Sequence, residues 1–86
     1  MSKATQVYYA TFDAVFFSLS PANQGRIESA VDKLGVRLDD FPHHRLKSSN
    51  RFRLRVGDYR VIYTFNVEQN TVHLLALGHR REIYQK

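Results

Sequence analysis

The segment Arg51–Val67, with the sequence RFRLRVGDYRVIYTFNV, decides the fold of this chain. Its first six residues alternate between arginine and an apolar side chain, a period of two that is typical of a β-strand with one buried and one polar face. Gly57 and Asp58 then mark a tight turn, and a second β-rich run extends from Tyr59 to about Val67. The segment therefore predicts a β-hairpin with arginines on one face and a core on the other.

Two more β-rich runs are expected to join this hairpin. Gln6–Ala10 is short and rich in aromatic and β-branched residues, and Thr71–Leu77 carries apolar side chains at both odd and even positions. Strict alternation along Thr71–Leu77 predicts two faces, one with His73, Leu75 and Leu77 and the other with Val72, Leu74 and Ala76. Apolar residues on both faces favour a central strand.

Two helices are predicted between the first strand and the hairpin. The first is brief, over Ala14–Leu19, with Thr11 or Asp13 as its cap. The second begins at Ser20 and Pro21, a favoured capping pair. An apolar stripe runs along the second helix at helical spacing, and Asp39–Pro42 stops the helix. The stripe consists of Ile27, Val31, Leu34 and Leu38.

The expected order is β-α-α-β-β-β in one small α+β domain over residues 1–86. The two N-terminal helices should pack on a mostly antiparallel four-stranded sheet, with His43–Asn50 as a polar connector and a short C-terminal tail or helix. A chain of 86 residues is too small to divide further.

Composition narrows the function classes. The chain has no cysteine, which excludes disulfides, thiol nucleophiles and cysteine-bound zinc. No apolar run is long enough for a signal core or a membrane span, so a cytoplasmic location is expected. Residues 1–42 hold four Lys and Arg against five acids, whereas residues 43–86 hold nine against three. This asymmetry favours a polyanionic partner, with nucleic acid first and an acidic protein second.

The predicted hairpin gathers arginines on one face. Arg51, Arg53 and Arg55 are neighbours by alternation, and the turn brings Arg60 back beside them. Such a cluster repels itself unless it binds phosphates or acidic side chains. Metal-free RNA cleavage needs a base for the ribose 2′-hydroxyl, cations at the phosphate and an acid for the leaving oxygen, roles open to His79, Arg60 and Arg80.

Two blocks, Arg53–Tyr63 and Leu77–Tyr84, resemble RelE-type toxins of the RelE/ParE toxin–antitoxin superfamily. The resemblance covers nearly the whole chain. It implies a ribosome-dependent messenger-RNA endonuclease that cuts in the A site by attack of the 2′-hydroxyl, without a metal or another cofactor, and inhibits translation. It also implies a hetero-oligomer with a RelB-like antitoxin, whose acidic and apolar segment wraps the toxin.

The resemblance also assigns roles to single residues. Arg51 and Arg53 match two basic strand residues, Arg60 the phosphate-stabilising arginine, Arg80 the proposed acid and Tyr84 the tyrosine that orients RNA. Arg53 stands where some relatives have lysine as a proposed general base, and a guanidinium is a poor base. Proton transfer is therefore assigned to His79, or else the arginines act only electrostatically. The predicted catalytic set is Arg53, Arg60, His79, Arg80 and Tyr84, and the predicted RNA contacts are Arg51, Arg55, Arg81, Lys47 and Arg45, with no metal ligands.

Alternatives remain open at this point. ParE-type toxins share the Tyr-Arg-Val-Ile-Tyr strand and poison DNA gyrase, although the block Gly78–Tyr84 favours the nuclease. A third alternative is a nucleic-acid-binding module without turnover. His43 and His44 are expected to be solvated, with incidental RNA contact as the lesser alternative. His73 is expected to be structural or exposed.

Overall fold

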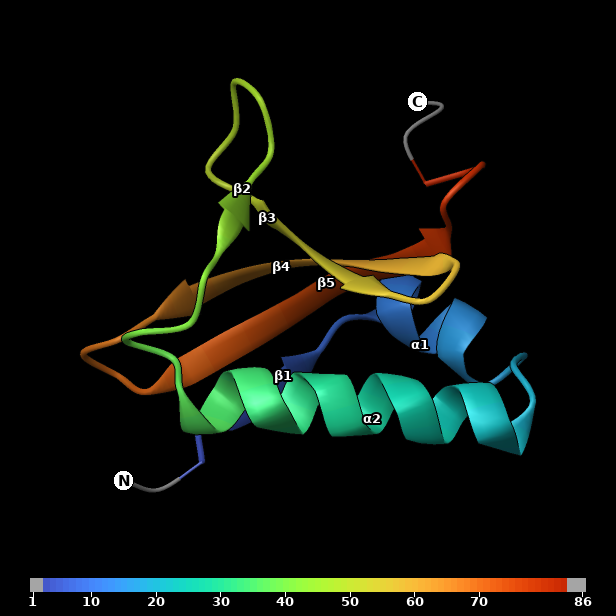
Figure 1. Ribbon diagram of the computed structural model, residues 1–86, viewed down its shortest axis with the longest axis horizontal. Helices are drawn as coiled ribbons and strands as arrows, with labels where there is room; N and C mark the ends of the chain where they lie inside the picture. Colours follow the sequence, from blue (N-terminus) through green and yellow to red (C-terminus); the bar gives the residue numbers. More distant parts are fainter. Residues whose placement is uncertain (1–2, 84–86) are drawn as a thin grey trace.

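The computed structural model describes residues 3–83, in which two helices pack on a five-stranded sheet (Figure 1). The sheet order is β1-β5-β4-β3-β2, with β1 parallel to β5 and every other pair antiparallel. The predicted α+β class, with both helices in the N-terminal half, is confirmed. The elements are β1 (Thr5–Tyr8), α1 (Ala10–Phe16), α2 (Pro21–Val36), β2 (His44–Arg45), β3 (Phe52–Val56), β4 (Tyr59–Asn66) and β5 (Thr71–His79).

The hairpin of β3 and β4 forms as its alternation predicts. Leu54 is buried, whereas Arg55 is exposed and lies opposite Arg60 across the pair. Gly57 occupies the turn with φ of 59°, a left-handed conformation in which glycine is unstrained. The hairpin therefore separates an apolar face, toward α2, from an arginine-bearing face on the opposite side.

A β-bulge interrupts the pairing of β4 with β5. Ile62 lies opposite Ala76, but the next residue, Tyr63, lies opposite Leu74, which leaves Leu75 as an extra residue on β5. An extra residue reverses the faces beyond it, so Leu74 and Leu77 both face the core. The predicted grouping of Leu77 with His73 is therefore wrong, because strict alternation holds only without a bulge.

The helices begin and end differently from the prediction. Ser20 caps α2, since its hydroxyl accepts the amide of Asn23 at 3.3 Å, and Pro21 is the first helical residue. The helix ends at Val36, two residues earlier than the stripe suggests, although Leu38 stays buried. The other helix, α1, begins at Ala10 instead of Ala14 and has no side-chain cap.

A fifth strand lies in the predicted connector. His44 pairs with Arg53 and Arg45 with Phe52, so β2 forms the edge of the sheet beside β3. The expected count of four strands is therefore wrong. A strand of two residues gives no periodic signal in the sequence, and β2 can be recognised only from its pairing with the longer β3.

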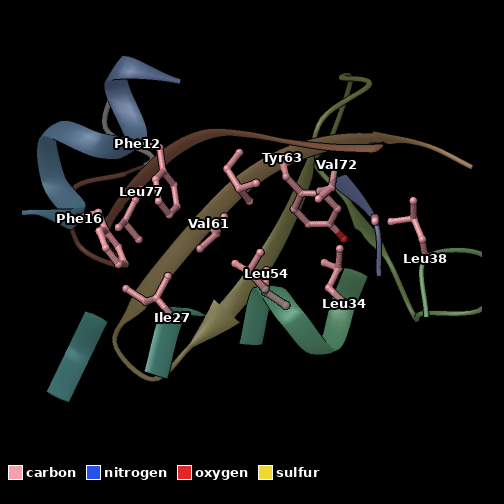
Figure 2. Close-up of a cluster of buried hydrophobic side chains, with 13 residues drawn as sticks. Phe12, Phe16, Ile27, Leu34, Leu38, Leu54, Val61, Tyr63, Val72 and Leu77 are labelled. Atoms are coloured by element: carbon pink, nitrogen blue, oxygen red, sulfur yellow. The ribbon is translucent and has the colours of Figure 1, made fainter. Parts of the chain in front are cut away.

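The core fills the space between one face of the sheet and α2. Figure 2 shows Val61, Tyr63 and Val72 on the sheet facing Ile27 and Leu34 on the helix. Phe12 and Phe16, one helical turn apart on α1, close one end of this core with their rings 5.6 Å apart. Neither helix of the described chain is long and apolar enough to cross a membrane.

The cap of α2 gives a first prediction. Ser20→Ala removes the acceptor for a free amide of the first turn and should lower the free energy of unfolding by about 1 kcal/mol. Urea denaturation checks this, with Ser29→Ala, at an exposed interior position of the same helix, as the matched control. Equal stability of the Ser20 variant and the wild type would contradict a stabilising cap.

Candidate nucleic-acid interface

The face of the sheet opposite α2, here called the open face, collects the arginines of β3 and β4. Arg53 and Arg55 alternate with the buried Leu54, and Arg60 lies directly opposite Arg55. In Figure 1, α2 lies below the sheet, while the β2–β3 connection and the turn that follows β5 extend above it. Three predicted site residues are therefore neighbours on one surface.

Arg53 occupies the middle of this surface. Its strand neighbours are His44 on β2 and Ile62 on β4, and directly paired residues share a face with Cβ atoms about 5 Å apart. Within residues 3–83, the Nε of Arg53 is buried and has no hydrogen-bond partner. A buried, charged donor without an acceptor is costly, so a reorientation of this partly exposed side chain toward an anion on the open face would recover a hydrogen bond.

Arg60 is held rigidly at the end of the hairpin. Its side chain is buried, with 6% of the residue exposed, and its Nη1 donates to the carbonyls of Gly57 and Tyr59, both at 2.8 Å. Nη1 has two hydrogens, and these bonds use both. The remaining N–H groups of the guanidinium are the donors that a phosphate could bind.

The C-terminal turn packs against this end of the open face. Gly78 lies opposite Arg60, and a Cβ at Gly78 would be 2.9 Å from Cδ1 of Ile83. Two contacts with Asp58 hold Arg80 beside the hairpin turn. The backbone N–H of Arg80 donates a hydrogen bond to the carbonyl of Asp58 at 2.7 Å, and the two side chains form an ion pair at 3.6 Å. The side chain of Arg80 is half-exposed, so its charge remains available beside the turn.

His79 lies on the other face of the sheet. It is opposite Tyr59, their rings meet edge to face at 5.8 Å, and both residues line a cavity with Asn23 and Arg26 of α2. The Nδ1 of His79 accepts the amide of Arg81 at 3.2 Å, so the neutral ring carries its proton on Nε2. The bulge in β5 causes this placement, because without it His79 would share the face of Arg60.

The remaining predicted residues are distributed more widely. Arg51, Lys47 and Arg81 are exposed. Arg45 lies opposite Phe52 and its guanidinium is 5.7 Å from that ring, which places it away from the open face. Tyr84 lies outside the described residues.

The two adjacent histidines have different environments. His43 is stacked on Phe65 at 3.9 Å between ring centroids, and its Nε2 lies 2.8 Å from the carbonyl of Leu38. A carbonyl can only accept, so Nε2 donates to it, and Nδ1 accepts a hydrogen bond from the hydroxyl of Tyr63 at 2.6 Å. Burial raises the pKa of the Tyr63 hydroxyl. The expectation of a solvated His43 is therefore wrong, whereas His44 is exposed and paired with Arg53.

His44 is the polar neighbour of Arg53 that the sequence interpretation did not assign to the site. The only sequence signal was its position ahead of the arginine strand. Its place on the open face follows from the pairing of β2 with β3, which a two-residue strand does not announce.

The contrast between the histidines is testable. His43→Ala leaves the buried hydroxyl of Tyr63 without its acceptor and should lower the free energy of unfolding by about 1–3 kcal/mol. His44→Ala should change it by less than about 0.5 kcal/mol, since the residue is exposed. Chemical denaturation of both variants checks this, and an equal loss in the two would contradict a structural role confined to His43.

The comparisons with known proteins agree with this architecture. The family model of the ParE toxin of type II toxin–antitoxin systems matches residues 3–84. The RelBE2 toxin–antitoxin complex of Mycobacterium tuberculosis is similar with a TM-score of 0.73 and 23% identity, over 95% of this chain and 97% of the other. The RelE–RelB complex of Pyrococcus horikoshii is similar with a TM-score of 0.73 and 25% identity, over 94% of this chain and 99% of the other. The comparison with curated proteins finds no match.

A double mutant of the E. coli toxin RelE in the free state is also similar, with a TM-score of 0.75 and 11% identity over 95% of this chain and 88% of the other. Fold and family model together define a toxin of the RelE/ParE superfamily, the class expected from the sequence. The chain belongs to the ParE toxin family of type II toxin–antitoxin systems.

Proposed function

We propose that this toxin is a ribosome-dependent messenger-RNA endonuclease whose open face binds the scissile phosphate. The observation that carries the proposal is the buried Nε of Arg53, which has no protein acceptor and lies between His44 and Ile62 on an open face rich in arginine. A phosphate oxygen satisfies such a donor, and guanidinium forks match phosphate geometry.

The proposed reaction is a transesterification within the RNA. The 2′-oxygen loses its proton and bonds to the neighbouring phosphorus, the bond to the 5′-oxygen breaks, and that oxygen takes up a proton. The products are a 2′,3′-cyclic phosphate and a 5′-hydroxyl. Arg53 and Arg60 stabilise the charge on the phosphorane, as preorganised donors do without reorganisation.

The placement of His79 changes the assignment of proton transfer in this mechanism. We keep Arg80 as the group beside the leaving oxygen and Tyr84 as the residue that orients RNA. The proposed contacts to the RNA backbone are Arg51, Arg55, Arg81 and Lys47, with Arg45 as a contact outside the open face. His79 faces the cavity beside α2, so the electrostatic alternative, with help from ribosomal groups, is better supported. Normal cutting by a His79→Ala variant would remove His79 from the mechanism.

The test uses programmed ribosomes that carry a defined message. The purified toxin should produce a cut in the A-site codon, detected by primer extension. Arg53→Gln should slow this cut by about 100-fold, because it removes a preorganised donor to the phosphorane. Arg80→Ala should slow it by at least about 100-fold if Arg80 supplies the proton.

Arg37→Ala is the control, since Arg37 is an exposed arginine at the end of α2, away from the open face. Wild-type rates in the Arg53 and Arg80 variants, with all proteins folded by circular dichroism, would overturn the assignment of the site.

A cognate antitoxin is the proposed regulatory partner, in a toxin–antitoxin hetero-oligomer. Membership of a type II toxin family supports it, and similar structures from M. tuberculosis and P. horikoshii are complexes with RelB-type antitoxins. The basic C-terminal half of the chain suits an acidic partner.

Inhibition of DNA gyrase is the second candidate. Two observations favour it: the matching family model is named for ParE, and His79 is separated from the arginines of the open face. Inhibition of gyrase-driven DNA supercoiling by the wild-type toxin, together with an uncut message on ribosomes, would replace the nuclease proposal. Salt-sensitive RNA binding without either effect would indicate a nucleic-acid-binding module.

A further inference from the structure

The two residues of β2 place a histidine beside the arginines of the open face. His44 lies directly opposite Arg53, and residues paired in this way share a face, with Cβ atoms about 5 Å apart. The next residue, Arg45, lies opposite Phe52 and therefore points to the other face. The pairing of β2 with β3 thus sets the side chain of His44 on the same side of the sheet as that of Arg53.

The four histidines of the chain differ in how their ring nitrogens are used. Both ring nitrogens of His43 are within hydrogen-bond distance of protein groups. One ring nitrogen of His73 lies 3.3 Å from the hydroxyl of Tyr9, and one of His79 accepts a backbone amide. His44 is exposed, and no hydrogen bond or ion pair within residues 3–83 involves its side chain. Both of its ring nitrogens are therefore free to meet a ligand on the open face.

The charged side chains that face His44 are cations. In the described sheet β2 is the edge and pairs with β3, where Arg53 is the direct neighbour of His44. Arg51 and Arg55 lie two residues to either side of Arg53 and share its face by alternation. Guanidiniums stay protonated, whereas a neutral imidazole has one nitrogen that accepts a proton. The pair of His44 and Arg53 therefore combines a proton acceptor with a fixed cation.

The fixed cations of the proposed cleavage stabilise charge but do not remove a proton. A base must lie within about 2.6–3.2 Å of the hydroxyl whose proton it takes. The 2′-hydroxyl and the phosphate that it attacks are attached to neighbouring carbons of one ribose, so the base must stand beside the cation that binds the phosphate. His44 meets this requirement through its pairing with Arg53, whereas His79 faces the cavity beside α2.

We propose that His44 is the general base of the RNA cleavage and takes the proton of the ribose 2′-hydroxyl while Arg53 binds the adjacent phosphate. This inference rests on the proposed nuclease function and supplies its first step. The 2′-oxygen bonds to phosphorus as its proton moves to a ring nitrogen of His44. The bond from phosphorus to the 5′-oxygen breaks, and that oxygen keeps the electron pair and takes up a proton. Water then removes the proton from the imidazolium.

The test compares His44→Ala with His73→Ala on programmed ribosomes that carry a defined message. His44→Ala should slow the cut in the A-site codon by at least about 100-fold, the lower range for general acid–base catalysis. The toxin concentration that gives half the maximal rate should stay the same, because the arginines that bind phosphate remain. His73→Ala, at a histidine of the same sheet whose ring contacts Tyr9, should cut at the wild-type rate.

Two further measurements separate proton transfer from a structural role. The rate of the wild-type toxin should rise as the pH is raised from about 5 to 8, the range in which imidazole loses its charge, and the residual rate of His44→Ala should lack this rise. Free imidazole in the buffer should restore part of the rate of His44→Ala and none of the rate of Arg53→Gln. Circular dichroism confirms that each variant is folded.

The nuclease proposal and the role of His44 fail in distinguishable ways. An uncut message with the wild-type toxin would overturn both. A wild-type rate in His44→Ala would overturn the role of His44 and leave the nuclease in place. A slow His44→Ala variant that keeps the wild-type pH profile and is not restored by imidazole would make His44 a positioning residue, which also contradicts its role as the base.

Discussion

The alternation along β3 is the constraint on which the rest of this structure depends. Leu54 is buried against α2, so Arg53 and Arg55 must lie on the opposite face. A shift of one residue would bury two guanidiniums and expose the core, which fixes the register of the hairpin strongly. Stability and function are thereby linked, because the same packing that forms the core presents the arginines together.

The bulge in β5 limits which groups can join those arginines. One extra residue at Leu75 allows Leu74 and Leu77 to pack into the core, and it also turns His79 toward α2. The open face therefore carries the imidazole of His44 beside Arg53, and the imidazole of His79 lies with Arg26 behind the sheet. This separation is the reason why the proposed mechanism relies on fixed cations.

Local signals in the sequence predicted the parts of the fold that depend on neighbouring residues. Ser20 and Pro21 marked the start of α2, and the period of two marked β3 with its arginine face. The features that the sequence did not predict depend on tertiary contacts. His43 is held by Phe65 and Tyr63, distant in sequence, and β2 exists only because β3 offers it an edge. The face of His79 could not be predicted, since the bulge leaves no residue pattern that separates it from regular alternation.

The family membership and the charge distribution agree with the proposed function. The arginines of β3 and β4 share the open face, where the proposed phosphate site lies. The basic C-terminal half of the chain also suits the acidic partner proposed above.

The most direct test of the central claim follows the side-chain Nε–H resonance of Arg53 by NMR during titration with a short RNA that carries a 2′-deoxy residue at the scissile position. Binding without cleavage should shift the Arg53 resonance strongly, while that of the exposed Arg37 stays in place. An unchanged Arg53 resonance at saturating RNA would contradict the assignment of the open face as the phosphate site.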